Sequence, residues 1–466
     1  MRHILARLSA VVILLSLASC GGDGPDFIWL RAVHTIPDAP PLQVIYEPYA
    51  VQQAMSFGVA SNEAGDSLLG RTGPFAGMTA NYFGPDNRVA GILLAKDIPV
   101  EKDHISTVVL AGTFDAPEAF TVLSPRRDRP LATLHFQFAH AATELGALDV
   151  YVTDPETELS ATAPLTTLDP LGYSESIEVP YGATRIRVTR AGTLDLVMDT
   201  GEREFAERDG PRGPGNEWLF TIAPSIALGD APVFLVASSG RSSEAIRDLD
   251  TPVTVRAIHA LPEPPSVDFY ATTEPEQRLL ESLTFRSRSP LVVTPTGDYS
   301  FAFRPAGDDG EPLAFQAVSL QRGQERLAVL IGPDDAPQVL VTDGDPRSVA
   351  TEARLRLANF SVGSNFFSLY LSETEEDALE SANLVLRDLR FGDVSGAAAR
   401  LPGEYYLTLT ERFYETPGEA ADAEETIFFG PEPIELFGGD AFFFGIFPPD
   451  EAGQPEVLVT FDNRTP

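Results

Sequence analysis

A short segment that occurs four times along the chain constrains its fold more than any other feature. The first copy begins at Arg31, passes His34 and a proline-rich bend, and ends in an apolar strand at Tyr46. The later copies run from His140 to Tyr151, from His259 to Tyr270, and from Asn359 to Tyr370. The gap from the His or Asn to the Tyr is 12, 11, 11 and 11 residues, whereas successive copies lie 106, 119 and 100 residues apart. A near-constant inner gap with a variable outer spacing predicts four copies of one domain.

The rest of the sequence predicts that each copy opens an all-β domain. The chain of 466 residues fits four domains of ordinary size. Short apolar runs alternate with turn residues, and only residues 373–386 could hold a helical turn or two. We therefore expect a tandem array of four Ig-like β-sandwich domains. The predicted units cover residues 27–125, 131–240, 252–346 and 351–463, and we expect them to lie as beads on a string, each with a core of its own.

Further landmarks recur inside the units. Phe57-Gly58 of the first unit returns as Leu171-Gly172 and Phe391-Gly392, with Phe285-Arg286 in the third unit. A glycine at such a point predicts a bulge or a tight turn where a Cβ atom would clash. Every unit then closes with two apolar strands around a turn. The four tyrosines and the preceding His or Asn are interpreted as structural marks of the repeat.

These features together resemble a bacterial secreted domain of unknown function, numbered 4397. The first and third copies carry its opening motif of Arg, His and prolines, whereas the second lacks the Arg and the bend and the fourth lacks the His. The resemblance implies tandem Ig-like β-sandwiches in an exported protein. It implies no particular chemistry.

The first residues predict export and lipid anchoring. Residues 1–19 combine Arg2 and Arg7 with a short apolar run, which is typical of a signal peptide and too short for a stable transmembrane helix. The sequence Leu-Ala-Ser-Cys ending at Cys20 is similar to a bacterial lipobox, and residues 20–26 would hold the lipidated Cys20 and a flexible tether. The predicted location is the bacterial cell envelope, at the outer membrane or cell surface. The alternative is an ordinary signal peptide with a chance cysteine.

The charge of the chain restricts its partners. Its 33 basic and 68 acidic residues give a formal net charge of −35. Such a surface repels phosphates, so nucleic acid and anionic lipid surfaces are not expected partners. Cys20 is the single cysteine, which leaves no intramolecular disulfide, and we expect a monomer whose units are stable through their own cores.

The repeated histidines are the most tempting candidates for chemistry. His34, His140 and His259 lack partners at the spacing of a metal site, and the fourth copy has Asn359, which cannot transfer protons. We interpret each as a buried side chain that bonds backbone groups of the following bend. Arg31, Arg256 and Arg356 lie three residues earlier, on the other strand face, and could pair with strand carboxylates such as Asp268. No metal, cofactor or catalytic residue is predicted.

The sequence thus favours a non-enzymatic, lipid-anchored scaffold or binding protein. A protein or carbohydrate ligand would meet the loops at the sandwich ends. The alternative is a carbohydrate- or Ca²⁺-binding adhesion module, because residues 308–311, 343–345 and 373–377 are acidic, although solvated turns have the same composition. A hydrolase is the third class, and 68 carboxylates supply pairs of no specificity.

Overall fold

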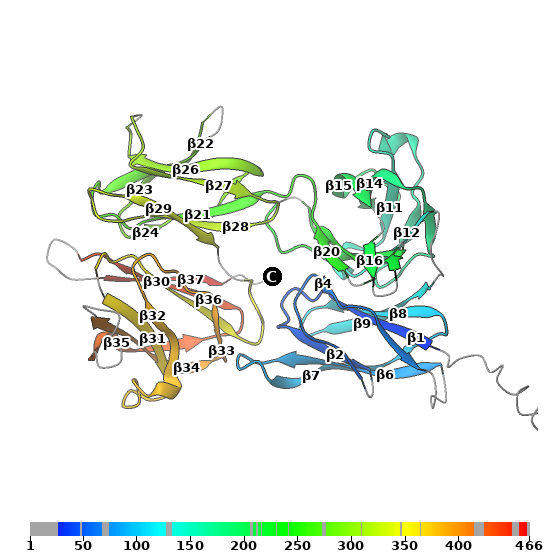
Figure 1. Ribbon diagram of the computed structural model, residues 1–466, viewed down its shortest axis with the longest axis horizontal. Coiled ribbons are helices and arrows are strands. Elements are labelled where there is room, and N and C mark those ends of the chain that lie inside the picture. The colour runs from blue at the N-terminus through cyan, green and yellow to red at the C-terminus, as the bar shows by residue number, and fades with distance from the viewer. Residues whose placement is uncertain are drawn as a thin grey trace, which may run out of the picture.

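The computed structural model folds into four β-sandwich units arranged around a common centre (Figure 1). It describes residues 27–46, 49–67, 74–126, 133–205, 208–210, 213–215, 217–229, 231–240, 242–272, 276–308, 310–344, 347–363, 365–413, 424–449 and 456–463. Cys20, the predicted signal peptide and the tether lie outside these residues. Within them, no helix is long and apolar enough to cross a membrane.

Unit one is a sandwich of two sheets. The first sheet, with the order β4-β1-β8-β9 and β5 also paired with β1, consists of Phe27–His34 (β1), Val59–Ala60 (β4), Ala64–Ser67 (β5), His104–Gly112 (β8) and Pro117–Pro125 (β9). The second sheet, with the order β3-β2-β6-β7, consists of Leu42–Tyr46 (β2), Tyr49–Met55 (β3), Phe75–Phe83 (β6) and Val89–Pro99 (β7). Alternate residues of both sheets face inward and form one buried apolar core.

Unit three repeats this arrangement strand for strand. Its first sheet, with the order β24-β21-β28-β29 and β25 also on β21, consists of Val253–His259 (β21), Ser287–Arg288 (β24), Val292–Thr294 (β25), Glu325–Ile331 (β28) and Gln338–Asp343 (β29). Its second sheet, with the order β23-β22-β26-β27, consists of Ser266–Thr272 (β22), Gln277–Thr284 (β23), Gly297–Pro305 (β26) and Ala314–Leu320 (β27). Its core is again built from the inner faces of both sheets.

Unit two keeps the plan and adds strands to it. The sheet β13-β10-β18-β19-β20 consists of Leu134–His140 (β10), Ile177–Val179 (β13), Glu217–Pro224 (β18), Val233–Ser239 (β19) and Ser242–Ile246 (β20). The sheet β12-β11-β14-β15 consists of Leu148–Thr153 (β11), Thr166–Leu168 (β12), Gly182–Arg190 (β14) and Leu196–Phe205 (β15). The unit also has a hairpin of Arg208–Gly210 (β16) and Gly213–Gly215 (β17), and two 3-10 turns, Thr143–Leu145 (η1) and Leu159–Ala161 (η2). Strand β20 extends this unit beyond residue 240, into the segment predicted as a linker, because Ile246 is buried and pairs with Leu235.

Unit four follows the plan with two four-stranded sheets. Its first sheet, with the order β33-β30-β36-β37, consists of Ala353–Asn359 (β30), Ala398–Arg400 (β33), Asp440–Phe447 (β36) and Glu456–Asn463 (β37). Its second sheet, with the order β32-β31-β34-β35, consists of Asn365–Ser372 (β31), Leu384–Leu389 (β32), Gly403–Phe413 (β34) and Glu425–Leu436 (β35). The helical turn predicted within residues 373–386 is present as one 3-10 turn, Ser381–Asn383 (η3).

One pairing shows that the four units share a single topology. The opening strand of each unit lies parallel to a later strand of the same sheet, and the repeated His or Asn always occupies the same register. The partners are His34 with Leu110, His140 with Ile222, His259 with Leu330, and Asn359 with Ile446. The prediction of a tandem array of β-sandwiches is therefore confirmed.

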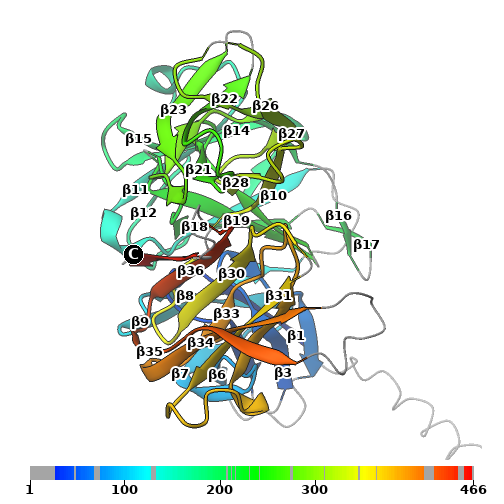
Figure 2. The same ribbon diagram turned by 90° about the vertical axis from the view of Figure 1, so that its left-hand side faces the viewer.

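The units do not lie as beads on a string, and that expectation was wrong. The first sheets of units one and two pack face to face through a shared apolar core that includes Val33, Val109 and Phe234. Units three and four share a second such core, which includes Val329, Phe360 and Phe447. The reason is that the outer faces of these first sheets are apolar, so each must be covered by a neighbour. Figures 1 and 2 show the result as two stacked pairs that lie side by side.

The two pairs also contact each other at both ends. The segment between units three and four reaches unit one, where the Ala350 N–H donates to the Asp38 carbonyl at 2.8 Å. Arg347 of the same segment donates to the carbonyl of Pro37 and lies over the ring of Phe57, 5.4 Å from its centroid. Units two and three are joined directly along the chain. The four units therefore surround a common centre.

Candidate functional site

The repeated His and Asn side chains are fully buried and hold the bend that follows them. The Nε2 atom of His34 donates to the Pro40 carbonyl at 3.3 Å, and its Nδ1 accepts the Ile36 N–H at 3.3 Å. His140 and His259 make the equivalent Nε2 bonds to backbone carbonyls, at 2.7 and 2.8 Å. Because a carbonyl can only accept, Nε2 of each ring carries a proton, and in His34 the accepting Nδ1 makes the imidazole neutral. These side chains brace the fold at the first corner of each sandwich.

Asn359 makes both bonds that His34 makes. Its amide nitrogen donates to the Asn365 carbonyl at 3.3 Å, and its amide oxygen accepts the Ser361 N–H at 3.0 Å. The two partners lie six and two residues further along the chain, as they do for His34. The bend is thus held equally by an imidazole and by an amide.

Burial shifts the pKa of each histidine. It lowers the pKa of His34 to about 3, with a further contribution from the nearby Arg347, and the Pro40 carbonyl only partly opposes this. Burial also lowers the pKa of His140 and of His259. Protonation of His34 would place a second N–H at Nδ1 against the Ile36 N–H, and the neutral ring is therefore favoured.

The four tyrosines are not equivalent. Tyr151, Tyr270 and Tyr370 lie on the outer face of the second sheet, whereas Tyr46 points into the core and donates to the Arg31 carbonyl at 2.8 Å. Strand register places Ile45 of unit one at the position of Tyr270. The gap of 12 residues rather than 11 has this effect, since a shift of one residue turns a strand side chain to the other face.

A second landmark is also displaced by one residue. Gly58, Arg286 and Gly392 adopt positive φ angles, and their N–H groups donate to the carbonyl of the repeated His or Asn. In unit two the residue with these properties is Leu171, not Gly172. The predicted alignment of Leu171-Gly172 with Phe57-Gly58 was therefore wrong by one position.

The arginines of the repeat serve local structure. Arg31 lies 3.7 Å from Glu63, and Arg356 donates to the carbonyls of Asp343 and Gly344, which ties unit four to the segment before it. Arg256 donates to the Ser289 carbonyl at 3.3 Å.

The suggested carboxylate partner for these arginines, Asp268, lies instead in the second sheet of unit three. It accepts the N–H groups of Ser282 and Gly307, at 2.8 and 3.2 Å, and lies 3.4 Å from Arg278. Burial opposes its ionisation, but these donors outweigh the burial and lower the pKa of Asp268. Asp268 therefore ties two neighbouring hairpins together.

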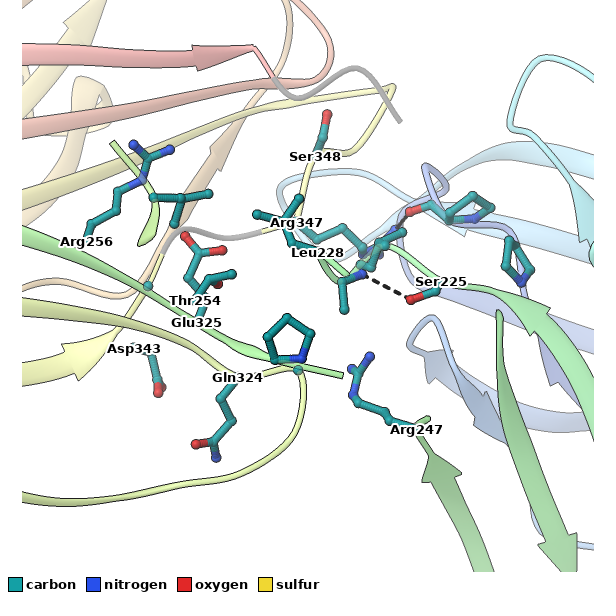
Figure 3. Close-up of a pocket in the computed structure, with 18 residues that line it drawn as sticks. Ser225, Leu228, Arg247, Thr254, Arg256, Gln324, Glu325, Asp343, Arg347 and Ser348 are labelled. Atoms are coloured by element: carbon teal, nitrogen blue, oxygen red, sulfur yellow. Dashed lines mark hydrogen bonds between the residues drawn. The ribbon is translucent and has the colours of Figure 1, made fainter. Parts of the chain in front are cut away.

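The candidate site is a pocket where units one, two and three meet the segment that leads into unit four, with a volume of about 880 Å³ (Figure 3). We call it the junction pocket. Its lining residues come from units one, two and three and from the segment before unit four: Pro37, Pro224, Ser225, Ile226, Ala227, Leu228, Arg247, Pro252, Thr254, Arg256, Leu291, Gly323, Gln324, Glu325, Asp343, Gly344, Arg347 and Ser348. Pockets of this size are typical of small-molecule sites.

Two arginines at the pocket flank a pair of aromatic rings. Arg347 lies over Phe57, Phe57 contacts Phe234 edge-on with centroids 5.6 Å apart, and Arg247 lies 5.6 Å from the centroid of Phe234. These rings belong to units one and two, whereas Arg347 belongs to the segment between units three and four. Burial and the neighbouring Arg354 lower the pKa of Arg347 to about 10. These two arginines and two aromatic rings therefore connect the two stacked pairs of units at the pocket wall.

The repeated residues do not line this pocket. Of the residues singled out in the sequence, Arg256 lines it, together with Asp343 and Gly344 of one acidic segment, while His34, His140, His259 and Asn359 lie in their own units. In the described part of the chain, no three His, Cys, Asp or Glu side chains come together as a metal site. Arg247 and Arg347 were missed because they lie in unpatterned segments between units.

The fold and the pocket define a tandem β-sandwich protein with a cavity where three of its units meet. The model of the family described as "Domain of unknown function (DUF4397)" matches residues 253–370, which run from β21 of unit three into β31 of unit four. This match confirms the resemblance over residues 253–370, the range of the third repeat and the opening of the fourth. No curated protein matches the chain.

Several solved structures show a distant likeness. The TIE protein of Bacillus anthracis is 10% identical with a TM-score of 0.16, over 92% of this chain and 72% of that one. A streptococcal virulence factor, from a structure described as α-glucan binding, is 10% identical with a TM-score of 0.16, over 41% and 92%. The CBMbc module of Eubacterium rectale Amy13K, in complex with maltoheptaose, is 11% identical with a TM-score of 0.15, over 46% and 98%. At such TM-scores the likeness carries no argument about function.

Proposed function

We propose that this protein is a non-enzymatic binding protein of the bacterial cell envelope and that it takes a small molecule in the junction pocket. The observation that carries the proposal is that units one, two and three and the segment leading into unit four all contribute to the lining of this cavity of about 880 Å³. The walls combine apolar side chains with a few guanidinium, carboxylate and hydroxyl groups, which is the usual composition of a ligand site. The sandwiches then act as the frame that holds these groups in place.

A thermal-shift screen of the purified protein tests this role. We expect at least one small molecule to raise the melting temperature, because a ligand that binds the folded chain stabilises it by mass action. Filling the pocket with Ala227→Trp should abolish that shift. If the stabilisation survives Ala227→Trp, or if no compound in the screen shifts the melting temperature, the pocket is not the binding site. If a bound compound is turned over and Ala227→Trp abolishes that turnover, the non-enzymatic role is contradicted.

The same screen addresses the alternative of an adhesion module. Maltoheptaose and CaCl₂ are included as representatives of a sugar ligand and of Ca²⁺. A shift with either one that Ala227→Trp leaves intact would place binding at a surface other than the junction pocket and favour the adhesion module.

The envelope location rests on the proposed lipid anchor. The lipobox-like sequence at Cys20 supports the attachment of acyl chains, which bind a bilayer through their buried methylene groups. We expect the wild-type protein to fractionate with membranes and to incorporate labelled palmitate, and Cys20→Ala to do neither. Labelling of the Cys20→Ala variant would show that the anchor lies elsewhere.

A further inference from the structure

The charge of the junction pocket contrasts with that of the whole chain. Acidic residues outnumber basic ones by 68 to 33 in the sequence, yet the pocket has Arg247, Arg256 and Arg347 against Glu325 and Asp343. The side chain of Asp343 is 88% exposed and pairs with Arg326, which offsets its charge outside the cavity. The pocket is therefore a positively charged site in an acidic protein.

Arg247 is held at the pocket without a carboxylate partner. Among the described residues, no Asp or Glu lies within ion-pair distance of its guanidinium, and burial alone lowers its pKa. Its aromatic neighbour is Phe234. A partly buried cation without a counter-ion has lost some of its hydration, and an anion beside it would offset that cost.

The position of Arg247 also depends on a glycine of the next unit. Gly323 has a φ of +67°, and a Cβ atom there would lie 2.6 Å from Cδ and 2.7 Å from Nε of Arg247. The guanidinium group of unit two thus packs against bare backbone of unit three. This close approach holds a positive charge in the lining of the pocket, between unit two and unit three (Figure 3).

Another part of the lining is apolar. The loop between β18 and β19 contributes Ile226 and Leu228, which are 42% and 50% exposed, and Pro252 and Leu291 add further apolar surface. Large apolar side chains left open beside a charged group favour a ligand that carries both kinds of surface.

We propose that the junction pocket binds a small organic anion with an apolar group, whose negatively charged head lies against Arg247 and whose apolar part lies on the loop from Pro224 to Leu228. This inference rests on the proposed binding function and names the ligand class. Arg347 and Arg256 add long-range attraction for the anion, and they also donate hydrogen bonds to the backbone carbonyls of Pro37 and Ser289.

Two fluorescent probes with the same aromatic skeleton test the inference. 8-Anilinonaphthalene-1-sulfonate is an anion, and N-phenyl-1-naphthylamine lacks the sulfonate. We expect the sulfonate to bind the wild-type protein at least about tenfold more tightly than the neutral amine, since one charge contact contributes about that factor. Arg247→Gln should remove this preference, and Ala227→Trp should abolish the binding of both probes.

A matched control separates a local contact from net charge. Arg88→Gln removes the same charge from a side chain that is 87% exposed in unit one, and it should leave both affinities unchanged. Unchanged circular dichroism and melting temperature of Arg247→Gln in the absence of probe would show that the fold is intact.

The outcomes distinguish this inference from the proposed function. The anion inference would be overturned if the two probes bound the wild type equally well, or if Arg247→Gln left the affinity for the sulfonate intact. In either case, binding that Ala227→Trp blocks would still support the pocket as a binding site. If Ala227→Trp left the binding of both probes unchanged, or if neither probe bound the wild type, both proposals would fail.

Discussion

Replacing Val329 by aspartate is expected to separate units three and four and to lower the free energy of unfolding by about 3–5 kcal/mol, the cost of an uncompensated buried charge. Val329 is fully buried on the outer face of β28, in the apolar core that these two units share. Its neighbours Ala328 and Leu330 point inward and build the core of unit three itself. The charge would therefore disrupt the contact between the units and leave the inner face of each sandwich in place.

The measurements are chemical denaturation and small-angle X-ray scattering. The radius of gyration should rise while the β-sheet circular dichroism persists. Val293→Asp is the matched control, because Val293 lies in the same unit and is 55% exposed, and it should change neither quantity. A Val329→Asp protein with wild-type size and stability would show that the shared core does not hold the pair together. Should this variant fail to fold, the milder Val329→Ala should still lower the free energy of unfolding.

Two strands of the sequence have a pattern that indicates burial on both faces, and this pattern predicts the shared cores. Residues 107–111 read Thr-Val-Val-Leu-Ala, and residues 327–331 read Leu-Ala-Val-Leu-Ile, so apolar side chains follow one another without alternation. Strands covered on both faces have such continuous apolar runs, whereas a strand with one wet face alternates. The run of β14, in which Ile186 and Val188 alternate with Arg185 and Arg187, shows the other pattern in the same chain. The beads-on-a-string expectation followed from counting strands without comparing these two patterns.

The repeat predicted the corner of each sandwich well and the junction pocket not at all. The His or Asn, the bend and the following strand lie close together in sequence, so their local hydrogen bonds could be inferred from spacing. The pocket instead depends on how four units are placed relative to one another. Arg247, Gly323 and Arg347 come from different units or linkers, and no periodicity connects them. Only the packing of the two stacked pairs brings these residues together.

Replacing His34 by asparagine is expected to reduce the acid sensitivity of unit one. The folded chain keeps His34 neutral, with a pKa of about 3, whereas the unfolded chain has the ordinary value of 6.5. Since the folded-state pKa is the lower one, this side chain stabilises the fold fully above about pH 6.5, and the contribution is lost as the pH falls from there towards 3. At about 1.36 kcal/mol per pH unit, the loss between pH 8 and pH 5 is about 2 kcal/mol. In the His34→Asn variant, residue 34 does not titrate in this range and should cause no such loss of stability.

Asn359 makes this substitution a test with a built-in standard, because unit four shows that an amide can make both hydrogen bonds of the imidazole. The variant loses the edge contact of His34 with Phe57, so at pH 8 we expect it to be about 1 kcal/mol less stable than the wild type. Near pH 5 the order should reverse. A Trp218→Phe background leaves Trp29 of unit one as the only tryptophan, and its fluorescence in urea titrations at pH 8, 6.5 and 5 follows that unit. If the free energy of unfolding of the two proteins changed with pH in parallel, His34 would titrate alike in the folded and the unfolded chain. The reciprocal substitution Asn359→His should make unit four acid-sensitive if a buried imidazole at this corner is the cause.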